Sequence, residues 1–215
     1  MSHRLRLDPH ELVQRAQEIR LLLLDVDGVL TDGHIILDDQ GVESKHFSVR
    51  DGSGISFWRQ SGRQVGILSG RSAPVVQKRA AELGISPVVQ GAGNKHAAFQ
   101  QILQQTGLAA HQVCYMGDDL PDLPVLSAGV GLAACPADAA AEVLRLAELV
   151  TEARGGRGAV RELIEILMNA TGCWEPIVAT LLASRPTAQP ASLTQPDLPA
   201  QHNPDQLVTN SNQPK

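Results

Sequence analysis

Residues 21–33 of this chain read LLLLDVDGVLTDG, a run of four leucines that passes directly into two aspartates and a glycine. An all-apolar run of this length is typical of a central parallel strand that is buried on both faces. The run ends at Asp25. Open α/β sheets bind their ligands beyond the carboxyl ends of the strands. We therefore expect Asp25 and Asp27 to lie at a functional site.

The sequence on both sides of this run alternates between helix and strand patterns. Upstream, Asp8-Pro9-His10-Glu11 is a helix-start signature, and we expect that helix to reach about residue 19. Downstream, the β-prone residues 35–37 and 42–49 flank an acidic glycine turn and predict a hairpin. The further elements predicted, in chain order, are helix 52–61, strand 64–68, helix 73–83, strand 87–89, helix 95–106, strand 112–116, helix 120–127, strand 130–133, helix 138–146, strand 148–150 and helix 158–169. This alternation predicts an α/β fold with a doubly wound parallel sheet.

Composition divides the chain into four segments. We expect an N-terminal helix within 1–19, an α/β domain over 20–170, a C-terminal extension over 171–184 and a disordered tail over 185–215. The tail is rich in proline and glutamine, so it has little apolar surface to offset its ordering entropy. The chain is 43% hydrophobic but only 3% aromatic, which predicts an aliphatic core.

Charge and cysteine usage bear on the class of protein. A net charge of −5 argues against bulk binding of nucleic acid. The first residues show no signal-peptide pattern, and the apolar run at 21–24 is too short to cross a membrane. Three cysteines at irregular spacing suit a reducing compartment. We predict a soluble cytoplasmic protein that acts on a small molecule, without a nucleic-acid or membrane partner.

Four separate segments bring polar residues to the same predicted edge of the sheet. They are residues 25–33 after the first strand, Ser69-Gly70-Arg71 after the next, Lys95 at the start of a helix, and residues 117–122, GDDLPD. Asp25 and Asp118 can together ligate a hard cation through carboxylate oxygens. Mg²⁺ prefers such ligands, so the sequence predicts a magnesium site.

The residue types in these segments suit phosphoryl transfer. Asp25 can attack phosphorus as a covalent nucleophile. Asp27 can protonate the leaving oxygen and then deprotonate the water that hydrolyses the aspartyl phosphate. The Ser69 hydroxyl can donate to a phosphoryl oxygen, and Lys95 offers a positive charge to the nucleophile and the phosphate. We predict a magnesium-dependent phosphatase whose nucleophile is Asp25.

In order and spacing, these segments resemble the four signature motifs of the haloacid dehalogenase-like superfamily. The match covers about residues 12–170, and residues 47–55 and 155–162 also resemble the subfamily of 3-deoxy-D-manno-octulosonate 8-phosphate phosphatases. The resemblance implies a Rossmann-like fold, Mg²⁺ as cofactor, and hydrolysis of the 8-phosphate in octulosonate and lipopolysaccharide biosynthesis. Ser53, where the family commonly has a larger residue, and the Pro/Gln-rich tail depart from the family pattern.

The resemblance also implies a role for each site residue. Asp25 would be the nucleophile and a metal ligand, Asp27 the acid–base residue and a ligand through its backbone carbonyl, and Asp118 the third ligand. Asp119 and Asp122 would lie behind these ligands, near Lys95. The residues expected to bind phosphate or substrate are Thr31, Arg50, Ser69, Gly70, Arg71 and Lys95.

Several residues also have a purely structural explanation, which the sequence leaves open. Arg71 could be a surface charge instead of a partner for a substrate carboxylate or phosphate. Arg50 and Asp51 could cap the next helix, contact substrate, or do both. The glycines of 155–158 could form a flexible turn, or the helix that follows them could bind an anion at its N-terminus.

The intervals between the motifs leave no room for a cap domain. The hairpin alone fits between the first two motifs, and one helix with one short strand fits between Arg71 and Lys95. A bare site is poorly shielded from water. We therefore predict a capless fold that assembles as a homotetramer, as the resemblance also implies. The hairpin of residues 34–49 would pack against its copies and cover a neighbour's site.

Two other functions remain open at this stage. One is a phosphatase for a 9-phosphorylated nonulosonate of the sialic-acid or 2-keto-3-deoxynononate type, whose members tend to carry an acidic residue where this chain has Arg71. The other is a non-catalytic regulatory protein with the same fold, which would usually have lost Asp25, Asp27 or Lys95. The residues present favour the octulosonate phosphatase.

Overall fold

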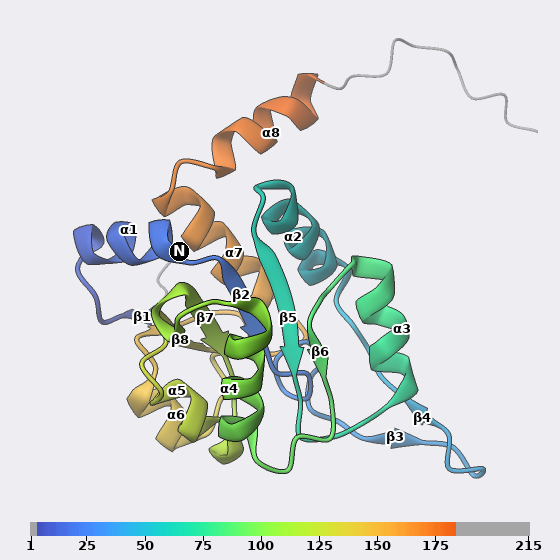
Figure 1. Cartoon of the computed structure of the whole chain (residues 1–215). Coiled ribbons are helices and arrows are strands. Elements are labelled where there is room, and N and C mark those ends of the chain that lie inside the picture. The colour runs from blue at the N-terminus through green and yellow to red at the C-terminus, as the bar shows by residue number, and fades with distance from the viewer. Residues whose placement is uncertain (1–3, 184–215) are drawn as a thin grey trace, which may run out of the picture. The chain divides into compact units, whose positions relative to one another are not determined.

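A seven-stranded sheet lies at the centre of the computed structural model, which describes residues 4–183 (Figure 1). The strand order is β1-β9-β8-β7-β2-β5-β6. β2 (Leu21–Leu24) lies in the middle and pairs in parallel with β5 (Gln64–Leu68) and β7 (Val113–Met116). The other strands are β1 (Arg4–Leu5), β6 (Val88–Val89), β8 (Leu132–Cys135) and β9 (Leu149–Val150). The predicted doubly wound parallel sheet is confirmed, with β1 added antiparallel to β9 at one edge.

Two apolar layers cover the two faces of this sheet, because the side chains of a strand alternate between faces. Leu22 and Leu24 of β2 belong to one layer, and Leu21 and Leu23 belong to the other. The helices of the first layer are α1 (Pro9–Glu18), α2 (Val49–Gln60), α3 (Pro74–Leu83) and α7 (Ala159–Ala170). Those of the second are α4 (Lys95–Thr106), α5 (Leu123–Leu126) and α6 (Ala141–Leu146), with 3₁₀ turns η1 (Ala110–Gln112) and η2 (Leu120–Asp122) beside them.

A small hairpin follows β2, as predicted. β3 (Ile36–Leu37) and β4 (Glu43–Ser44) form a separate two-stranded antiparallel sheet near the edge where β5 ends (Figure 1). Ile35, Leu37 and Val42 of this hairpin are exposed. Within the described residues, the hairpin is the sole insertion between β2 and α2, so the capless architecture is confirmed.

The strand predicted over 42–49 is wrong in its second half. β4 ends at Ser44, and α2 begins at Val49 instead of residue 52. Ser48 caps this helix, since its side-chain oxygen accepts a hydrogen bond from the Asp51 N–H at 3.3 Å. The apolar residues on both sides of Ser48 imitate a strand pattern, which hides the cap in the sequence.

After β7, three predicted elements differ from the structure by more than one residue or in kind. The helix predicted over 120–127 is η2 followed by the four-residue α5, because each segment begins with a proline near its first position. The helix predicted from 138 begins at Ala141. The strand predicted over 130–133 lies two residues later as β8, where Ala134 and Cys135 pair with β9.

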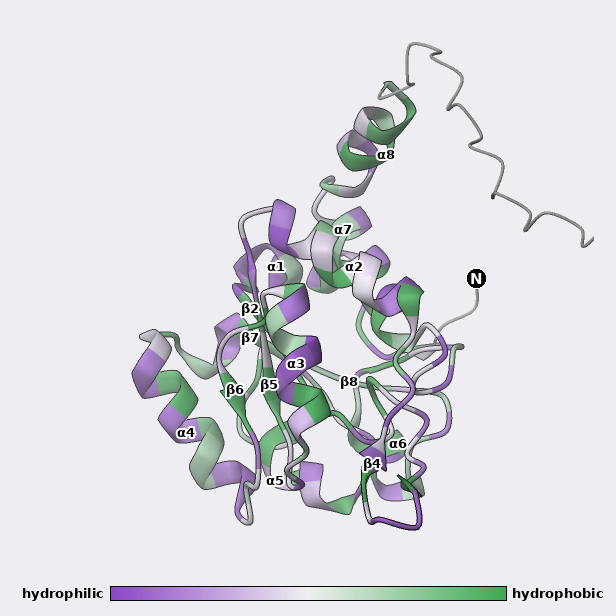
Figure 2. Cartoon of the chain, turned by 90° about the vertical axis from the view of Figure 1, so that its right-hand side faces the viewer, coloured by the Kyte–Doolittle hydropathy of each residue, from purple (hydrophilic) through white to green (hydrophobic). Residues whose placement is uncertain are grey.

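The predicted C-terminal extension contains a helix that the sequence reading missed, α8 (Trp174–Ala183). It is largely apolar (Figure 2), and its Leu181 and Leu182 are exposed. The Trp174 ring meets Phe57 of α2 edge-on, with 5.8 Å between centroids. Within residues 4–183 no single helix is long and apolar enough to cross a membrane; α7 and α8 meet the criteria only together, as a pair bent by 104°. The predicted disordered tail over 185–215 lies outside the described residues.

Candidate active site

A cleft of about 270 Å³ opens at the carboxyl ends of the parallel strands. It brings together the four polar segments that the sequence singled out, although they lie far apart along the chain. Its lining residues are Asp25, Asp27, Gly33, Ser69, Gly70, Arg71, Lys95, Asp118, Asp119, Pro121 and Asp122. The cleft is therefore the place where the predicted chemistry can occur.

Asp25 is buried at the end of β2 and is held by three contacts. Its backbone N–H donates to the Met116 carbonyl at 3.0 Å, which continues the β2–β7 pairing. Its Oδ1 accepts from the Val26 N–H at 2.7 Å, and its Oδ2 lies 2.8 Å from the Nζ of Lys95. The side chain is thus fixed in direction, which a nucleophile needs.

Asp122 is fully buried, and its carboxylate connects Lys95, Tyr115 and the loop of Asp118 by hydrogen bonds. Its Oδ1 accepts from the Lys95 ammonium at 2.6 Å and from the Tyr115 hydroxyl at 2.5 Å. Its Oδ2 accepts from the backbone N–H groups of Asp118 and Asp119, at 3.0 and 3.2 Å. Both oxygens are therefore occupied, so Asp122 orients Lys95 and the Asp118 loop.

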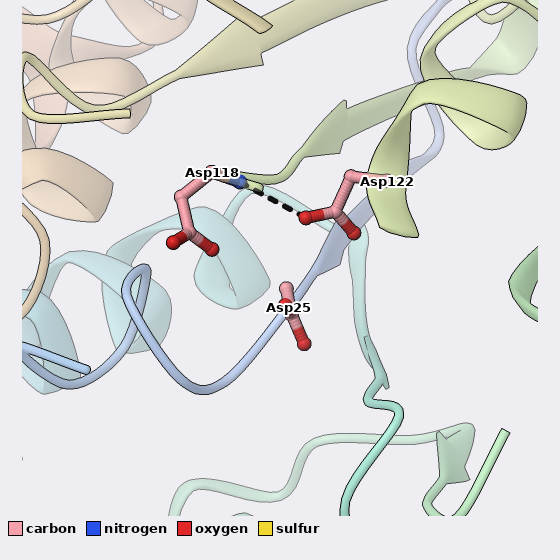
Figure 3. Close-up of side chains that lie close together, drawn as sticks. All are labelled: Asp25, Asp118 and Asp122. Carbon is pink, nitrogen blue, oxygen red and sulfur yellow. Dashed lines mark hydrogen bonds between the residues drawn. The ribbon is translucent and has the colours of Figure 1, made fainter. Parts of the chain in front are cut away.

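Three carboxylates converge in the cleft (Figure 3). One oxygen from each of Asp25, Asp118 and Asp122 lies within 4.8 Å of the others. The pKa of Asp25 is raised to about 7, mainly by burial and secondly by the nearby Asp122 carboxylate, although Lys95 acts to lower it. The pKa of Asp118 is raised to about 8, mainly by burial and secondly by the Asp25 and Asp122 carboxylates. The cluster thus holds more negative charge than Lys95 neutralises.

A divalent cation fits this cluster. The Oδ1 of Asp118 is buried, and no group among the described residues hydrogen-bonds it. Each Asp122 oxygen already accepts two hydrogen bonds, whereas each Asp25 oxygen has one such contact and keeps a lone pair. The side-chain ligands that this cluster offers to a cation are therefore Asp25 and Asp118. Both offer hard carboxylate oxygens, the donor type that Mg²⁺ prefers. The predicted backbone carbonyl ligand from Asp27 remains a prediction.

Comparison with known proteins places this site in a family. The model of the haloacid dehalogenase-like hydrolases matches residues 48–129. The chain is 46% identical over 162 residues to the 3-deoxy-D-manno-octulosonate 8-phosphate phosphatase KdsC of Escherichia coli K12, which covers 75% of this chain and 86% of that protein. The chain belongs to the haloacid dehalogenase-like hydrolases.

Solved structures of this hydrolase family share the fold. A probable YrbI-family phosphatase from Pseudomonas syringae matches with a TM-score of 0.78 and 42% identity, over 80% of this chain and 98% of that one. The 3-deoxy-D-manno-octulosonate 8-phosphate phosphatase of Moraxella catarrhalis, solved with magnesium, phosphate and KDO, matches with a TM-score of 0.77 and 37% identity, over the same shares of the two chains.

Glycines bring the loops of this hydrolase into close contact around the cluster. Gly28 has a φ of +87°, and a Cβ there would lie 2.0 Å from the Oδ2 of Asp118. A Cβ on Gly155 would lie 1.8 Å from the Gly28 carbonyl oxygen, and one on Gly156 would meet the backbone of Thr31 at 2.5 Å. The loop before α7 therefore packs directly on the loop that carries the predicted catalytic aspartates.

The structure also decides how Asp51 acts. Its carboxylate accepts hydrogen bonds from the N–H groups of Gly158 and Arg161, at 3.2 and 2.8 Å, and so caps α7 from more than 100 positions away. The helix that Asp51 caps is α7, whereas the sequence pointed to the next helix. The sequence left open whether the N-terminus of α7 binds an anion, and in the structure the Asp51 carboxylate occupies that position.

Two predicted substrate-binding residues lie away from the cleft within one chain. The buried Thr31 hydroxyl donates to the Val26 carbonyl and accepts from the Gly33 N–H, both at 3.3 Å, so it stabilises its own loop. Arg50 is exposed on α2 and lines a separate hollow beside Arg157. The Thr31 side chain follows the local turn that holds it, and the Arg50 side chain follows its exposed position on α2, neither of which a motif alone predicts.

Two charged residues near the cleft were missed. Lys45 of the hairpin donates a hydrogen bond to the Asp27 carboxylate, and Glu43 accepts a pair of contacts from Arg71. Burial of Lys45 acts to lower its pKa, but its hydrogen bonds to Asp27 and Glu43 together raise the pKa above its ordinary value. The signal in the sequence was the alternation of the two residues, which places both on one face of a strand.

Proposed function

We propose that this chain hydrolyses the phosphate monoester of 3-deoxy-D-manno-octulosonate 8-phosphate to 3-deoxy-D-manno-octulosonate and phosphate. The observation that carries the proposal is the 46% identity to the E. coli phosphatase over most of its length. The complete cleft at Asp25, Lys95 and Asp118 supports it, because a chain that had lost the activity would have no need to keep these groups in contact.

The first half-reaction transfers the phosphoryl group to the chain. An Asp25 oxygen forms a bond to phosphorus while the bond from phosphorus to the sugar oxygen breaks. The leaving sugar oxygen takes a proton from Asp27. Lys95 and the Ser69 hydroxyl hold the phosphoryl oxygens. Asp25 and Asp118 would hold Mg²⁺, which would offset the negative charge on the phosphoryl group.

The second half-reaction frees the phosphate. Asp27, now a carboxylate, takes a proton from water, and the water oxygen bonds to phosphorus as the bond to Asp25 breaks. Phosphate leaves, and Asp25 is restored as a carboxylate. Lys95 stays in place through both steps because the buried Asp122 holds it at 2.6 Å.

The other two candidate functions find less support. Arg71 lines the cleft and carries a charge that suits a substrate carboxylate, whereas the nonulosonate phosphatases tend to have an acidic residue there. A regulatory protein without activity would not require Asp25 and Lys95 to lie 2.8 Å apart.

We also propose that the chain forms a homotetramer through the hairpin of residues 34–49 and works in the cytoplasm. The exposed Ile35, Leu37 and Val42 on a two-stranded sheet support assembly, since such a hairpin is marginal in water without a partner surface. Copies packed around a closed axis would bury these side chains and shield the open cleft.

Release of free phosphate tests the function. With Mg²⁺ present, kcat/KM should be higher for 3-deoxy-D-manno-octulosonate 8-phosphate than for a nonulosonate 9-phosphate or p-nitrophenyl phosphate. Asp25→Asn should abolish turnover, and Glu142→Gln on the exposed face of α6 should not. A preference for the nonulosonate would refute the substrate, and Asp25→Asn activity within about tenfold of wild type would refute the nucleophile.

A further inference from the structure

Two charged residues of the hairpin contact residues that line the cleft of their own subunit. Glu43 lies in β4 and Lys45 follows the strand directly, and the two side chains contact each other. The Lys45 ammonium contacts the Asp27 carboxylate and lies 2.8 Å from an oxygen of Glu43. The Lys45 side chain is only 1% exposed, although the hairpin itself lies at the surface.

Arg71 closes these contacts into a ring of alternating charges. Its Nη2 lies 3.2 Å from both carboxylate oxygens of Glu43, and its Nε lies 3.7 Å from Asp27 Oδ2. The ring joins the loop after β2, the hairpin and the loop after β5. Of its four members, Asp27 and Arg71 line the cleft, and Glu43 and Lys45 stand behind them.

The burial of the Lys45 side chain distinguishes its contact with Asp27 from an ordinary surface ion pair, whereas Arg71 is 47% exposed. An exposed pair adds little and does not hold a side chain in one place. A buried ammonium must keep its carboxylate partners, because a lone charge without water is costly. Lys45 therefore fixes the position of the Asp27 carboxylate. The nearest Arg71 nitrogen, at 3.7 Å, is beyond hydrogen-bond distance.

We propose that Lys45 is a positioning residue for the reaction: it holds Asp27 where the leaving oxygen departs, and Glu43 anchors both Lys45 and Arg71. This inference rests on the proposed role of Asp27 as the acid–base group. It gives the hairpin a task within its own subunit, separate from any contact with a neighbouring copy.

The leaving group provides the sharpest test. A sugar alkoxide leaves poorly unless it is protonated, whereas p-nitrophenolate is a stable anion that needs no proton. Mispositioning of Asp27 should therefore slow the first substrate more than the second. The readout is kcat/KM, because it includes only the steps up to departure of the leaving group and so excludes hydrolysis of the aspartyl phosphate, which both substrates share.

The experiment compares the full-length wild type with Lys45→Met, which keeps an unbranched apolar stem and removes the charge. We expect kcat/KM for the octulosonate 8-phosphate to fall about tenfold, part of the roughly 10²–10⁴-fold that an acid–base group contributes. For p-nitrophenyl phosphate we expect a fall of less than about threefold. Lys78→Met, the same change on the exposed surface of α3, should alter neither value.

Other outcomes separate this inference from the proposed function. Asp27→Asn should also lower kcat/KM more for the octulosonate 8-phosphate than for p-nitrophenyl phosphate, and by a larger factor than Lys45→Met. If Asp27→Asn lowers kcat/KM equally for both substrates, both the Asp27 assignment and the Lys45 inference fail. An equal loss for Lys45→Met beside a selective loss for Asp27→Asn overturns the Lys45 inference alone. If Lys45→Met does not fold, Lys45→Gln, which keeps a neutral donor, must show the selective loss.

Discussion

At the scale of single residues, the site holds three carboxylates close together in a largely buried position, with Lys95 beside them. Asp25 and Asp118 are buried near a third carboxylate, and Lys95 is the cation that contacts two of the three. Such an arrangement costs free energy unless a bound cation offsets it. Two predictions follow from this imbalance, one about the ligand Asp118 and one about pH.

Asp118→Asn should remove the stabilisation that Mg²⁺ gives. At about 100 times its Kd, a ligand adds roughly 2.7 kcal/mol to the folded state, which is on the order of 5–10 °C in Tm for a chain of this size. Wild type should show that rise in differential scanning fluorimetry, and Asp118→Asn should show almost none. Glu142→Gln, a matched loss of one exposed carboxylate, should keep the full rise. A full rise in Asp118→Asn would exclude Asp118 as a ligand.

The metal-free protein should become less stable as pH rises. The pKa values of Asp25 and Asp118 are raised in the folded state, to about 7 and about 8, above their ordinary value of 3.8. Groups with raised folded pKa values stabilise the fold fully below the unfolded pKa and lose that contribution as pH rises through the folded pKa. The free energy of unfolding should fall between about pH 4 and pH 8, by at most about 1.4 kcal/mol per group per pH unit.

Urea titrations at several pH values, with chelator and with Mg²⁺, measure this effect. The curve with chelator should slope downward, and the gain from Mg²⁺ should be larger at pH 8 than at pH 6, since protons compete with the cation for the same oxygens. A metal-free stability that rises over this range would contradict the pKa directions.

At the scale of elements, α7 and the loop before it hold the catalytic loop in shape. Asp51 caps α7 from α2, and Gly155-Gly156 packs on the backbone of residues 28–32. The apolar side chains of α7 lie in the same layer as α1 and α2. Elements more than 100 residues further along the chain therefore help to hold its first motif in place.

Gly155→Ala should damage both stability and turnover. The added Cβ would lie 1.8 Å from the Gly28 carbonyl oxygen, so one backbone segment must shift. We expect a loss of several kcal/mol in unfolding free energy, within the range for severe backbone clashes. We also expect phosphatase activity at least about tenfold lower, because Gly28 adjoins Asp27.

Gly93→Ala is the matched control for this change. A Cβ at Gly93 meets nothing within 4 Å, so the variant should melt and turn over like wild type. If Gly155→Ala behaved like Gly93→Ala in both assays, the close packing of the two loops would not hold in solution.

At the scale of the whole molecule, the hairpin bears on both the proposed assembly and the proposed positioning of Asp27. It exposes apolar side chains at Ile35, Leu37 and Val42, yet its Lys45 contacts Asp27, which lines the cleft. Deletion of the hairpin would remove both features at once. A test of assembly must therefore change the apolar face and keep Glu43 and Lys45.

Intact protein should scatter light as four copies of the 22.9 kDa chain. Leu37→Lys with Val42→Lys should lower the mass to that of smaller species, because charges on the hairpin face would have to be buried at each contact. Leu181→Lys changes a similarly exposed leucine on α8 and should leave the tetramer intact. A monomeric mass for the fully active wild type at micromolar concentration would refute the assembly.

The local pattern of residues determined much of this protein. The four leucines of β2, the bounds of β5 and the bounds of α4 follow from apolar runs and helix-start residues, and the structure confirms them. The four polar segments could be predicted to meet because parallel strands end at one edge of a sheet. These features depend on neighbours in the sequence or on a rule shared by all open α/β sheets.

The tertiary structure alone decided the rest. Asp51 caps a helix more than 100 residues away, β1 adds to the edge of β9, and Lys45 of the surface hairpin contacts Asp27 at the cleft. Each contact joins segments whose approach depends on how side chains and glycines pack in three dimensions. A pattern of residue types along the chain carries the periodicity of an element but not the distance between two elements, so these partners could not be read from it.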